Sequence, residues 1–235
     1  MSTAEGGGNV VTDGLLLYLD AANTKSFVSG ATIWNDLSRS VNNGTLVNSP
    51  TFDSLNGGSM VFNGTTNLIT LPQIRPTLLT LSVWFKATGI PTNNDASGGN
   101  LIVSSPQLFN GAVQYGLGYS WLNQRVVFNV QANTTILATS NNSVLRNTIY
   151  NIVGTYDGSN RRIYLNGQQV AIDVWTTNPV YPTSGVIGAQ IGAWNYPGFT
   201  RFFNGNIYQA SIYNRALSAS EVLQNFNTNR ARFGI

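Results

Sequence analysis

The sequence predicts an all-β fold, a sandwich or barrel of short antiparallel strands followed by one short helix. From residue 14 to residue 213, short apolar or alternating runs are separated by Gly, Asn, Pro and Asp. These runs give about a dozen strands at a spacing of roughly 8–15 residues, which is typical of sandwiches and barrels. The chain shows no alternation of strands with helices and no internal repeat, so a parallel βαβ sheet is not expected.

The N-terminal part of the chain is predicted to hold a flexible arm and a first strand. Residues 1–12 include three consecutive glycines, so we expect a flexible N-terminal arm there and a single domain over residues 13–235. Residues 15–19 are predicted to form a strand that ends at Asp20. Further along, Asn63-Gly64 is a turn signal between two short apolar runs.

Residues 79–86 alternate with the two-residue period of a strand that is buried on one face. Leu81, Val83 and Phe85 lie on one face of this strand. The other face carries Ser82, Trp84 and Lys86. Large aromatic side chains in a sandwich usually pack in its interior. We therefore expect Trp84, like Trp34, to be packed.

Residues 149–173 carry the clearest hairpin signals in the chain. Asp157-Gly158 and Asn166-Gly167 supply the positive φ angles that tight hairpins require, and they divide this region into three strands. Two further strands are expected at residues 186–191 and 207–213.

One helix is predicted, at residues 218–228. Ser218 and Glu221 have the spacing of a capping box, and Leu217 and Val222 occupy the positions of a hydrophobic staple. The helix is expected to pack on the edge of the sandwich, and the less favoured alternative is a helix that binds a partner. The tail after it is expected to form a docking strand or an arm.

The composition is poor in charge. Charged residues make up 9% of the 235 residues, against about 25% in an ordinary soluble domain. Such a surface repels itself weakly, so it favours either close packing in an assembly or a neutral extracellular domain. The net charge is +3, but the twelve basic residues are scattered and form no stripe with interleaved aromatics. Nucleic-acid binding is therefore not expected.

Two residue types are missing from the sequence, and each absence excludes a class of chemistry. The chain has no cysteine, which excludes disulfides and Cys-metal sites, and no histidine, which excludes Ser-His-Asp triads and His-metal centres. The N-terminus lacks the basic and apolar regions of a secretory signal. No run of 18 apolar residues occurs, so membrane insertion is not expected. We expect the protein to be synthesised in a host cytoplasm.

Three stretches resemble the laminin-G-like, concanavalin A-like jelly-roll superfamily. In family order they are residues 14–23 with 34–38 and 43–46, residues 155–159 with 163–167, and residues 203–207 with 212–222. This version is similar to those in bacteriophage virion proteins and bacterial surface proteins. The resemblance implies a two-sheet antiparallel jelly-roll sandwich with its first and last strands side by side, so that residues 15–19 neighbour residues 207–213.

The carboxylates do not have the pattern of a glycosidase. Such an enzyme needs two carboxylates that face the scissile bond. The chain has two glutamates, of which Glu5 lies in the arm and Glu221 caps the helix, and its aspartates are isolated. A single structural calcium ion bound by Asp20 and Asp36 is a weak alternative. The competing interpretation is that Asp20 ends a strand and Asp36 caps a turn.

Glycan binding is the ligand function that the residues favour most. Sugar sites combine an aromatic platform with amide and guanidinium donors. The predicted site residues lie in loops rich in Gly and Pro, and they are Trp194, Asn195, Tyr196, Arg201, Trp175 and Tyr181. Tyr119 and Trp121 form a further cluster. Core or edge packing is the competing interpretation for all of these aromatics.

These observations favour a protein that is not an enzyme. We expect a structural or adhesion protein of a virion, such as a capsid decoration, fibre or tail component, that also recognises host-surface glycan. Its expected partners are other virion proteins and further copies of the chain in a symmetric oligomer. The alternative is a stand-alone lectin-like module of a bacterial surface or secreted system. Fold does not decide between these functions.

Overall fold

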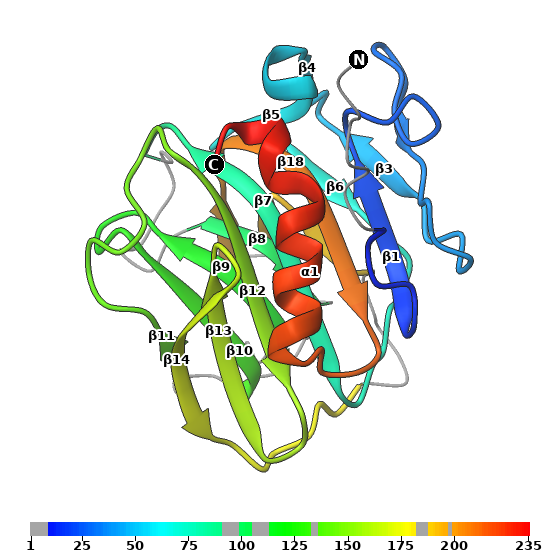
Figure 1. Ribbon diagram of the computed structural model, residues 1–235. Helices are drawn as coiled ribbons and strands as arrows, with labels where there is room; N and C mark the ends of the chain where they lie inside the picture. Colours follow the sequence, from blue (N-terminus) through cyan, green and yellow to red (C-terminus); the bar gives the residue numbers. More distant parts are fainter. Residues whose placement is uncertain (1–8, 91–98, 105–112, 133–135, 182–187, 197–198) are drawn as a thin grey trace, which may run out of the picture.

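Two large antiparallel sheets face each other in the computed structural model (Figure 1). The structure describes residues 9–90, 99–104, 113–132, 136–181, 188–196 and 199–235. Within these ranges, the side chains of residues 99, 100, 113, 132, 195, 196 and 199 lie outside the description. The arrangement confirms the predicted sandwich with one short C-terminal helix and excludes the alternative of a closed barrel.

The first sheet, sheet A, carries the strands nearest to both ends of the described chain. Its spatial order is β14 (Gln168–Val174), β13 (Asn160–Leu165), β12 (Ile149–Tyr156), β7 (Leu79–Ala87), β18 (Asn204–Tyr213), β5 (Ser59–Asn63) and β4 (Thr51–Asp53). The first strand, β1 (Leu15–Asp20), pairs with the second half of β18, beside β5. This pairing confirms that the first and last strands are neighbours.

The second sheet, sheet B, packs against sheet A. Its order is β11 (Leu137–Ala138), β10 (Arg125–Ala132), β9 (Val113–Ser120), β8 (Gly99–Val103), β15 (Gln190–Ile191), β6 (Leu68–Thr70), β3 (Gly44–Val47) and β2 (Ile33–Trp34). A separate hairpin of β16 (Ala193–Tyr196) and β17 (Phe199–Phe202) lies between β15 and β18 in the chain.

The alternation of β7 places the hydrophobic core as predicted. Leu81, Val83 and Phe85 belong to the main core cluster between the sheets. Trp84 points to the opposite face of sheet A, where it is buried under the C-terminal segment. Trp34 is fully buried in the main core, so both tryptophans are packed as expected.

The meander β12–β13–β14 also matches its prediction. Strands β12 and β13 are joined across Asp157-Gly158, where Asp157 accepts backbone N–H bonds from Ser159 and Asn160 at 2.9 and 2.7 Å. Strands β13 and β14 are joined by Asn166 and Gly167, both with positive φ, as a tight hairpin turn requires.

The helix begins at the predicted cap and runs slightly beyond its predicted end. Helix α1 (Ala219–Arg230) follows Ser218, which forms a complete capping box with Glu221. Figure 1 shows α1 lying across the sheet that contains β7, β12 and β18. The helix therefore covers the outer face of sheet A. In the described residues, no helix is long and apolar enough to span a membrane.

The tail after α1 docks differently from the strand or arm that the sequence predicts. Residues Ala231–Phe233 form a 3₁₀ turn, η2, and a second such turn, η1, spans Leu55–Gly57. Phe233 stacks on Trp84 with ring centroids 4.4 Å apart, and Phe226 of α1 stacks on the same indole at 5.6 Å. Burial of Phe233 explains why the tail continues as a helical turn, because this path brings the ring onto Trp84.

Part of the predicted flexible arm is also docked on α1. The Val11 N–H donates to Asn225 at 2.8 Å, and the Tyr213 hydroxyl donates to the Val11 carbonyl at 3.0 Å. The Asn9 carbonyl accepts a hydrogen bond from Gln224 at 2.9 Å. Residues 9–12 therefore belong to the domain rather than to the arm, and residues 1–8 lie outside the described residues.

Candidate functional site

The sandwich has two ends, and the predicted aromatic residues divide between them. One end carries the turn between β9 and β10 at residues 121–124, the segment 139–147 and the hairpin β16–β17. Segment 139–147 is tied to that turn by backbone bonds from Asn142 and Val144, and to the end of β7 by a 2.7 Å bond from the Asn147 N–H to the Ala87 carbonyl. We call this the Trp121 end.

The hairpin β16–β17 reaches the Trp121 end along β8. The Gly192 N–H donates to the Leu101 carbonyl at 3.1 Å, and the chain then continues into β16 beside the first residues of β8. Gly99 of β8 pairs with Tyr119 of β9. The hairpin therefore runs in the direction of Tyr119.

Trp194 and Arg201 are brought together within this hairpin. They are cross-strand partners in the pairing of β16 with β17. The Arg201 guanidinium lies 5.2 Å from the centre of the Trp194 ring, within the range of a cation–π interaction. Trp194 is half-buried, between the exposed and the packed positions that the sequence leaves open.

Tyr119 is buried at this end with its hydroxyl lacking a partner. The ring packs against Phe85 at 5.7 Å between centroids, and the residue is 2% exposed. Burial raises the pKa of Tyr119 to about 12, although the nearby charge of Arg146 acts in the opposite direction, so the phenol stays protonated at neutral pH. Its hydroxyl has no hydrogen-bond partner among the described residues. The phenol is therefore an unused donor.

Three more side chains in the same β9–β10 region carry buried polar atoms without partners. In the described part of the chain, Trp121 Nε1, Arg125 Nε and Asn129 Oδ1 make no hydrogen bond. The Arg125 head makes one long bond, at 3.4 Å, from Nη1 to Asn141. Buried polar atoms in native proteins are normally satisfied, so such a group of unpaired atoms calls for water or a ligand.

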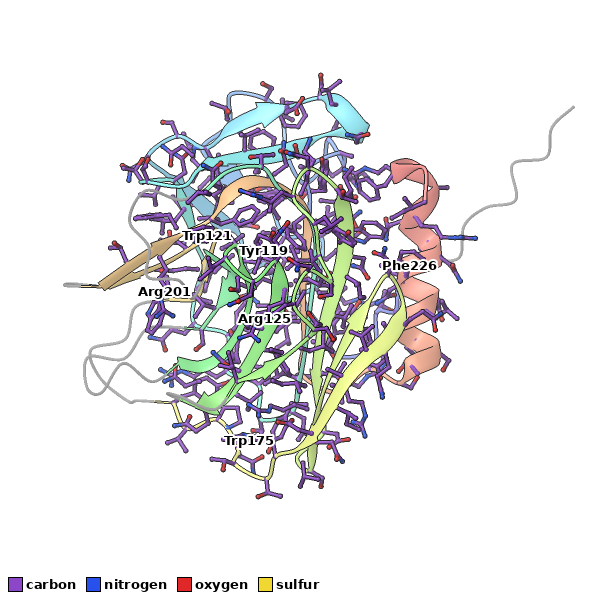
Figure 2. The ribbon with its side chains drawn as sticks, turned by 90° about the vertical axis from the view of Figure 1, so that its left-hand side faces the viewer. Tyr119, Trp121, Arg125, Trp175, Arg201 and Phe226 are labelled. Carbon is purple, nitrogen blue, oxygen red and sulfur yellow. The ribbon has the colours of Figure 1, made fainter. Side chains whose placement is uncertain are left out.

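Sequence reasoning missed Arg125 and Asn129. Both lie on β10, where Val126, Phe128 and Val130 belong to the core cluster. Alternation places Arg125 and Asn129 on the outer face of sheet B, half-exposed. The alternation of residues 125–131 is the signal that could have identified them. Figure 2 shows Tyr119, Trp121, Arg125 and Arg201 on the side of the molecule away from α1.

The predicted residues Trp175 and Tyr181 lie at the opposite end of the sandwich, and Figure 2 shows Trp175 well below Tyr119 and Trp121. The Trp175 N–H donates to the Ser159 carbonyl in the turn that follows β12. The Tyr181 hydroxyl donates to the Pro76 carbonyl at 2.7 Å, and burial raises its pKa. Both side chains thus have packing roles, and they are not near Trp194.

Trp175 covers a buried arginine. The Arg161 guanidinium lies 4.1 Å from the centre of the Trp175 ring and makes two hydrogen bonds to Asp173, at 3.1 and 2.5 Å. Arg161 is fully buried, and the Trp175 indole N–H donates to the Thr177 carbonyl. Every part of this arrangement is satisfied by the protein itself.

The side chains of the predicted site residues Asn195 and Tyr196 lie outside the described residues. Their backbone belongs to β16, in which Asn195 pairs with Thr200 and Tyr196 with Phe199. Their contribution to binding therefore stays a prediction.

The calcium candidates Asp20 and Asp36 are both engaged by the protein. Asp20 ends β1 and forms an ion pair with Arg232 at 2.7 Å. Both Asp36 oxygens accept hydrogen bonds, including one from the Tyr18 N–H at 2.8 Å and one from the Asn42 N–H at 2.8 Å. In the described part of the chain no three acidic residues gather as metal ligands. These positions fit the turn and strand-end roles better than a calcium site.

Two clefts lie elsewhere on the described surface. One, of about 520 Å³, is lined by residues 12–15 and 37–39. The other, of about 420 Å³, lies between β3 and β4, where Phe27 and Phe52 have ring centroids 5.6 Å apart. Neither cleft contains a predicted site residue. We call the second of these the Phe52 cleft. It combines aromatic rings with Ser and Thr hydroxyls, so it is the competing location for a small ligand.

The chain belongs to the concanavalin A-like lectin/glucanases superfamily, because the family model with that description matches residues 63–223, more than half of the chain. Among curated proteins, none matches this chain in sequence.

Several solved structures share the fold at low sequence identity. Sialidase from Trypanosoma rangeli in complex with sialic acid has a TM-score of 0.70 and 18% identity, over 99% of this chain and 36% of the sialidase. Domain 4 of AbnA, a GH43 extracellular arabinanase from Geobacillus stearothermophilus, in complex with arabinotriose has a TM-score of 0.62 and 15% identity, over 92% of this chain and 99% of that domain. The binding domain of botulinum neurotoxin DC in complex with SialylT has a TM-score of 0.66 and 13% identity, over 92% of this chain and 52% of that chain.

These similarities establish the fold alone. The chain spans 36% of the length of the sialidase, so nothing of the whole sialidase is transferred by the alignment. The family description names lectins and glucanases, and the three similar structures named above are complexes with sialic acid, arabinotriose and SialylT.

Proposed function

We propose that the chain is a glycan-binding module without catalytic activity, and that the Trp121 end holds the saccharide. The observation that carries this proposal is the presence there of unpaired buried polar atoms on Tyr119 and Trp121, whose rings pack on the core, and on Arg125, which pairs with Ser120 at the start of β10. They accompany an indole–guanidinium pair in the adjacent hairpin.

The chemistry of this end matches what a sugar presents. A pyranose has an apolar face of C–H groups, which stacks on an indole, and a rim of hydroxyls, which accept from and donate to polar side chains. The phenol, the indole N–H and the Arg125 guanidinium are donors, and the hydroxyl oxygens of a sugar can accept hydrogen bonds from them.

The related structures support a carbohydrate as the ligand class. The arabinanase domain is solved with arabinotriose, the sialidase with sialic acid and the neurotoxin domain with SialylT. Each of these ligands is a property of that protein. For this chain they motivate a saccharide probe rather than a particular sugar.

The distribution of carboxylates supports a role in binding rather than hydrolysis. A glycosidase places two carboxylates across the scissile bond. The described carboxylates form ion pairs, caps and turns away from the Trp121 end: for example, Glu221 pairs with Arg215, Asp173 with Arg161 and Asp157 with Arg162. None of the residues that define the Trp121 end, within the described ranges, is acidic.

The virion role stays a prediction that rests on the sequence resemblance. Within a virion, a module of this kind would attach the particle to a glycan on the host surface. Mass spectrometry of virus particles purified from cells that produce the chain would test it, and absence of the chain from those particles would contradict it. The alternative is a lectin-like module of a bacterial surface or secreted system.

The test of glycan binding is a saccharide array followed by titration of the best probe against the full chain. Trp121→Ala should lower the affinity at least about tenfold, which is about 1.4 kcal/mol, because the stacking platform is lost. Trp194→Ala should weaken binding in the same way. Trp194→Ala should keep the thermal unfolding profile of the parent. Trp121→Ala should unfold at a lower temperature, because its ring packs against the core, but it should still unfold in one cooperative transition.

Phe52→Ala is the matched control, because it removes an aromatic ring from the competing cleft. Its affinity should equal that of the parent. Loss of binding in Phe52→Ala with full binding in Trp121→Ala would place the saccharide in the Phe52 cleft and reject the Trp121 end. A chain that binds no saccharide on the array would reject the proposed function.

A further inference from the structure

The arginines of this protein differ in whether the fold gives them a carboxylate. Four of them form an ion pair with an Asp or Glu, at 2.5 to 2.7 Å between nitrogen and oxygen: Arg161, Arg162, Arg215 and Arg232. Within the described residues, Arg125 and Arg146 form no ion pair. Both of these lie at the Trp121 end, next to the proposed saccharide site.

Arg125 is half-buried at the first position of β10, beside Ser120 of β9. Its head reaches Asn141 through one long hydrogen bond, at 3.4 Å, and its Nε has no hydrogen-bond partner among the described residues. A guanidinium has five N–H donors, so the protein leaves most of the donors of this side chain unused. A partly desolvated cation without a counter-ion is unfavourable, and this favours the binding of an anion.

Arg146 is held against the turn between β9 and β10, and its side chain is exposed. Its backbone N–H donates to the Gln124 side chain at 3.3 Å. The N–H of the next residue donates to a carbonyl at the end of β7 at 2.7 Å. The Arg146 charge acts on the Tyr119 phenol, where it opposes the rise in pKa that burial causes. The backbone of Arg146 is therefore fixed beside the saccharide site, with its charge directed to solvent and to Tyr119.

The hairpin β16–β17 adds a third guanidinium to the same end. Arg201 lies over the Trp194 ring, 5.2 Å from its centre. The described residues of the Trp121 end include no Asp and no Glu. Three cationic groups without a carboxylate among them make the electrostatic potential of this end positive.

We propose that the saccharide bound at the Trp121 end is acidic, and that its carboxylate or sulfate group pairs with Arg125 and Arg146. This inference rests on the proposed glycan site and names the class of its ligand. A carboxylate or a sulfate has oxygen atoms that accept parallel hydrogen bonds from the fork of a guanidinium. A neutral sugar accepts only weaker bonds from the same donors and leaves both charges uncompensated.

The indole and the guanidinium groups then have separate tasks. Trp121 stacks on the apolar face of the sugar ring, which acidic and neutral sugars share. Arg125 and Arg146 recognise the acidic group, which the neutral sugar lacks. Loss of the indole should therefore weaken the binding of both kinds of sugar, and loss of an arginine should weaken the binding of the acidic one alone.

A saccharide array that holds acidic probes beside their neutral counterparts tests the proposal on the full chain. Suitable pairs are oligogalacturonate with its carboxyl-reduced form, and sulfated lactose with lactose. The strongest probe should be acidic and should bind at least about tenfold more tightly than its neutral counterpart in about 50 mM NaCl. This preference should shrink in about 500 mM NaCl, because salt screens the exposed charges.

The outcomes separate this inference from the proposed function. A strongest probe that is neutral, or an acidic probe that binds no better than its neutral counterpart, overturns the inference and leaves glycan binding in place. A chain that binds no saccharide on the array rejects both.

Two substitutions test the assignment of the arginines. Arg125→Gln and Arg146→Gln should each weaken binding of the acidic probe at least about fivefold and change binding of its neutral counterpart less than about twofold. Because Arg146 is exposed, Arg146→Gln should also keep the thermal unfolding profile of the parent.

Arg39→Gln is the matched control, because it removes the same charge from an exposed arginine in the cleft at residues 12–15, away from the Trp121 end. It should bind the acidic probe like the parent. An equal loss in Arg39→Gln would show that net charge alone is responsible. That result, or normal binding of the acidic probe by Arg125→Gln and Arg146→Gln, overturns the proposal.

Discussion

The two ends of the sandwich each bring tryptophan and arginine together, and they differ in what satisfies the side chains. Opposite the Trp121 end, Arg161 is buried under Trp175 and held by two bonds to Asp173. At the Trp121 end, Trp121 and Arg125 retain buried nitrogen atoms that make no bond within the described residues. The same residue types therefore serve packing where the fold supplies a counter-ion, and remain available for a ligand where it does not.

The largest effect is expected from a substitution at the end opposite the Trp121 end, where Asp173 neutralises the buried Arg161. Asp173→Ala leaves the Arg161 charge buried without a carboxylate, and this should lower the free energy of unfolding by about 3–5 kcal/mol. Urea denaturation of the variant and the parent measures it. Asp13→Ala is the control, because Asp13 is 83% exposed in its pair with Arg215, and it should cost less than about 1 kcal/mol. Equal effects of the two variants would contradict the conclusion that Asp173 compensates a buried charge on Arg161.

Trp175→Ala should have a smaller effect on the same end. The half-buried indole packs against the core and covers Arg161, so its loss should lower the free energy of unfolding by about 2 kcal/mol. Saccharide affinity should not change. An intact fold with lost saccharide binding would instead show that Trp175 belongs to the binding site, as predicted from the sequence.

Tyr119→Phe tests the Trp121 end of the sandwich. The phenol oxygen is buried and unpaired within the described structure, so removing it should leave the free energy of unfolding unchanged or raise it by up to about 1 kcal/mol. Saccharide affinity should fall, because a donor is lost. Destabilisation of the variant would indicate that the hydroxyl has a structural partner.

The smallest effect is expected from alkaline pH. The pKa of Tyr119 is raised to about 12 in the fold, mainly by burial, against about 10 in an unfolded chain. Because the raised pKa favours the neutral phenol, its contribution to stability is complete below about pH 10 and is lost as pH rises to about 12. Tyr119→Phe should therefore lose less stability than the parent over that interval. Identical pH profiles would contradict the raised pKa.

Local signals predicted most of the fold. The capping box of Ser218 and Glu221, the glycine turns of the meander and the alternation of β7 each depend on neighbouring residues, and each appears as expected. Docking of Val11 and Phe233 depends on residues that are distant in the sequence, Asn225 and Trp84. No local pattern marks such contacts. The sequence therefore predicts a flexible arm where residues 9–12 are docked, and a docking strand or arm where the tail forms a 3₁₀ turn.

The candidate site was predictable only in part, for the same physical reason. Trp175 and Trp194 both lie near Gly- and Pro-rich loops and carry the same local signal. Their surroundings in the folded chain distinguish the two tryptophans. Trp175 lies over Arg161, whereas Trp194 lies in a hairpin at the other end of the sandwich. Arg125 and Asn129 were missed because neither is aromatic, although their strand alternates clearly.

The position of β18 has a consequence for how the chain is made. This strand, residues 204–213, is the shared partner of β1, β5 and β7, and it fills the centre of sheet A from near the end of the described chain. During synthesis those three earlier strands leave the ribosome without the neighbour that joins them. Sheet A therefore closes only after residues 204–213 have left the ribosome, so folding of the sandwich waits for its own last strand.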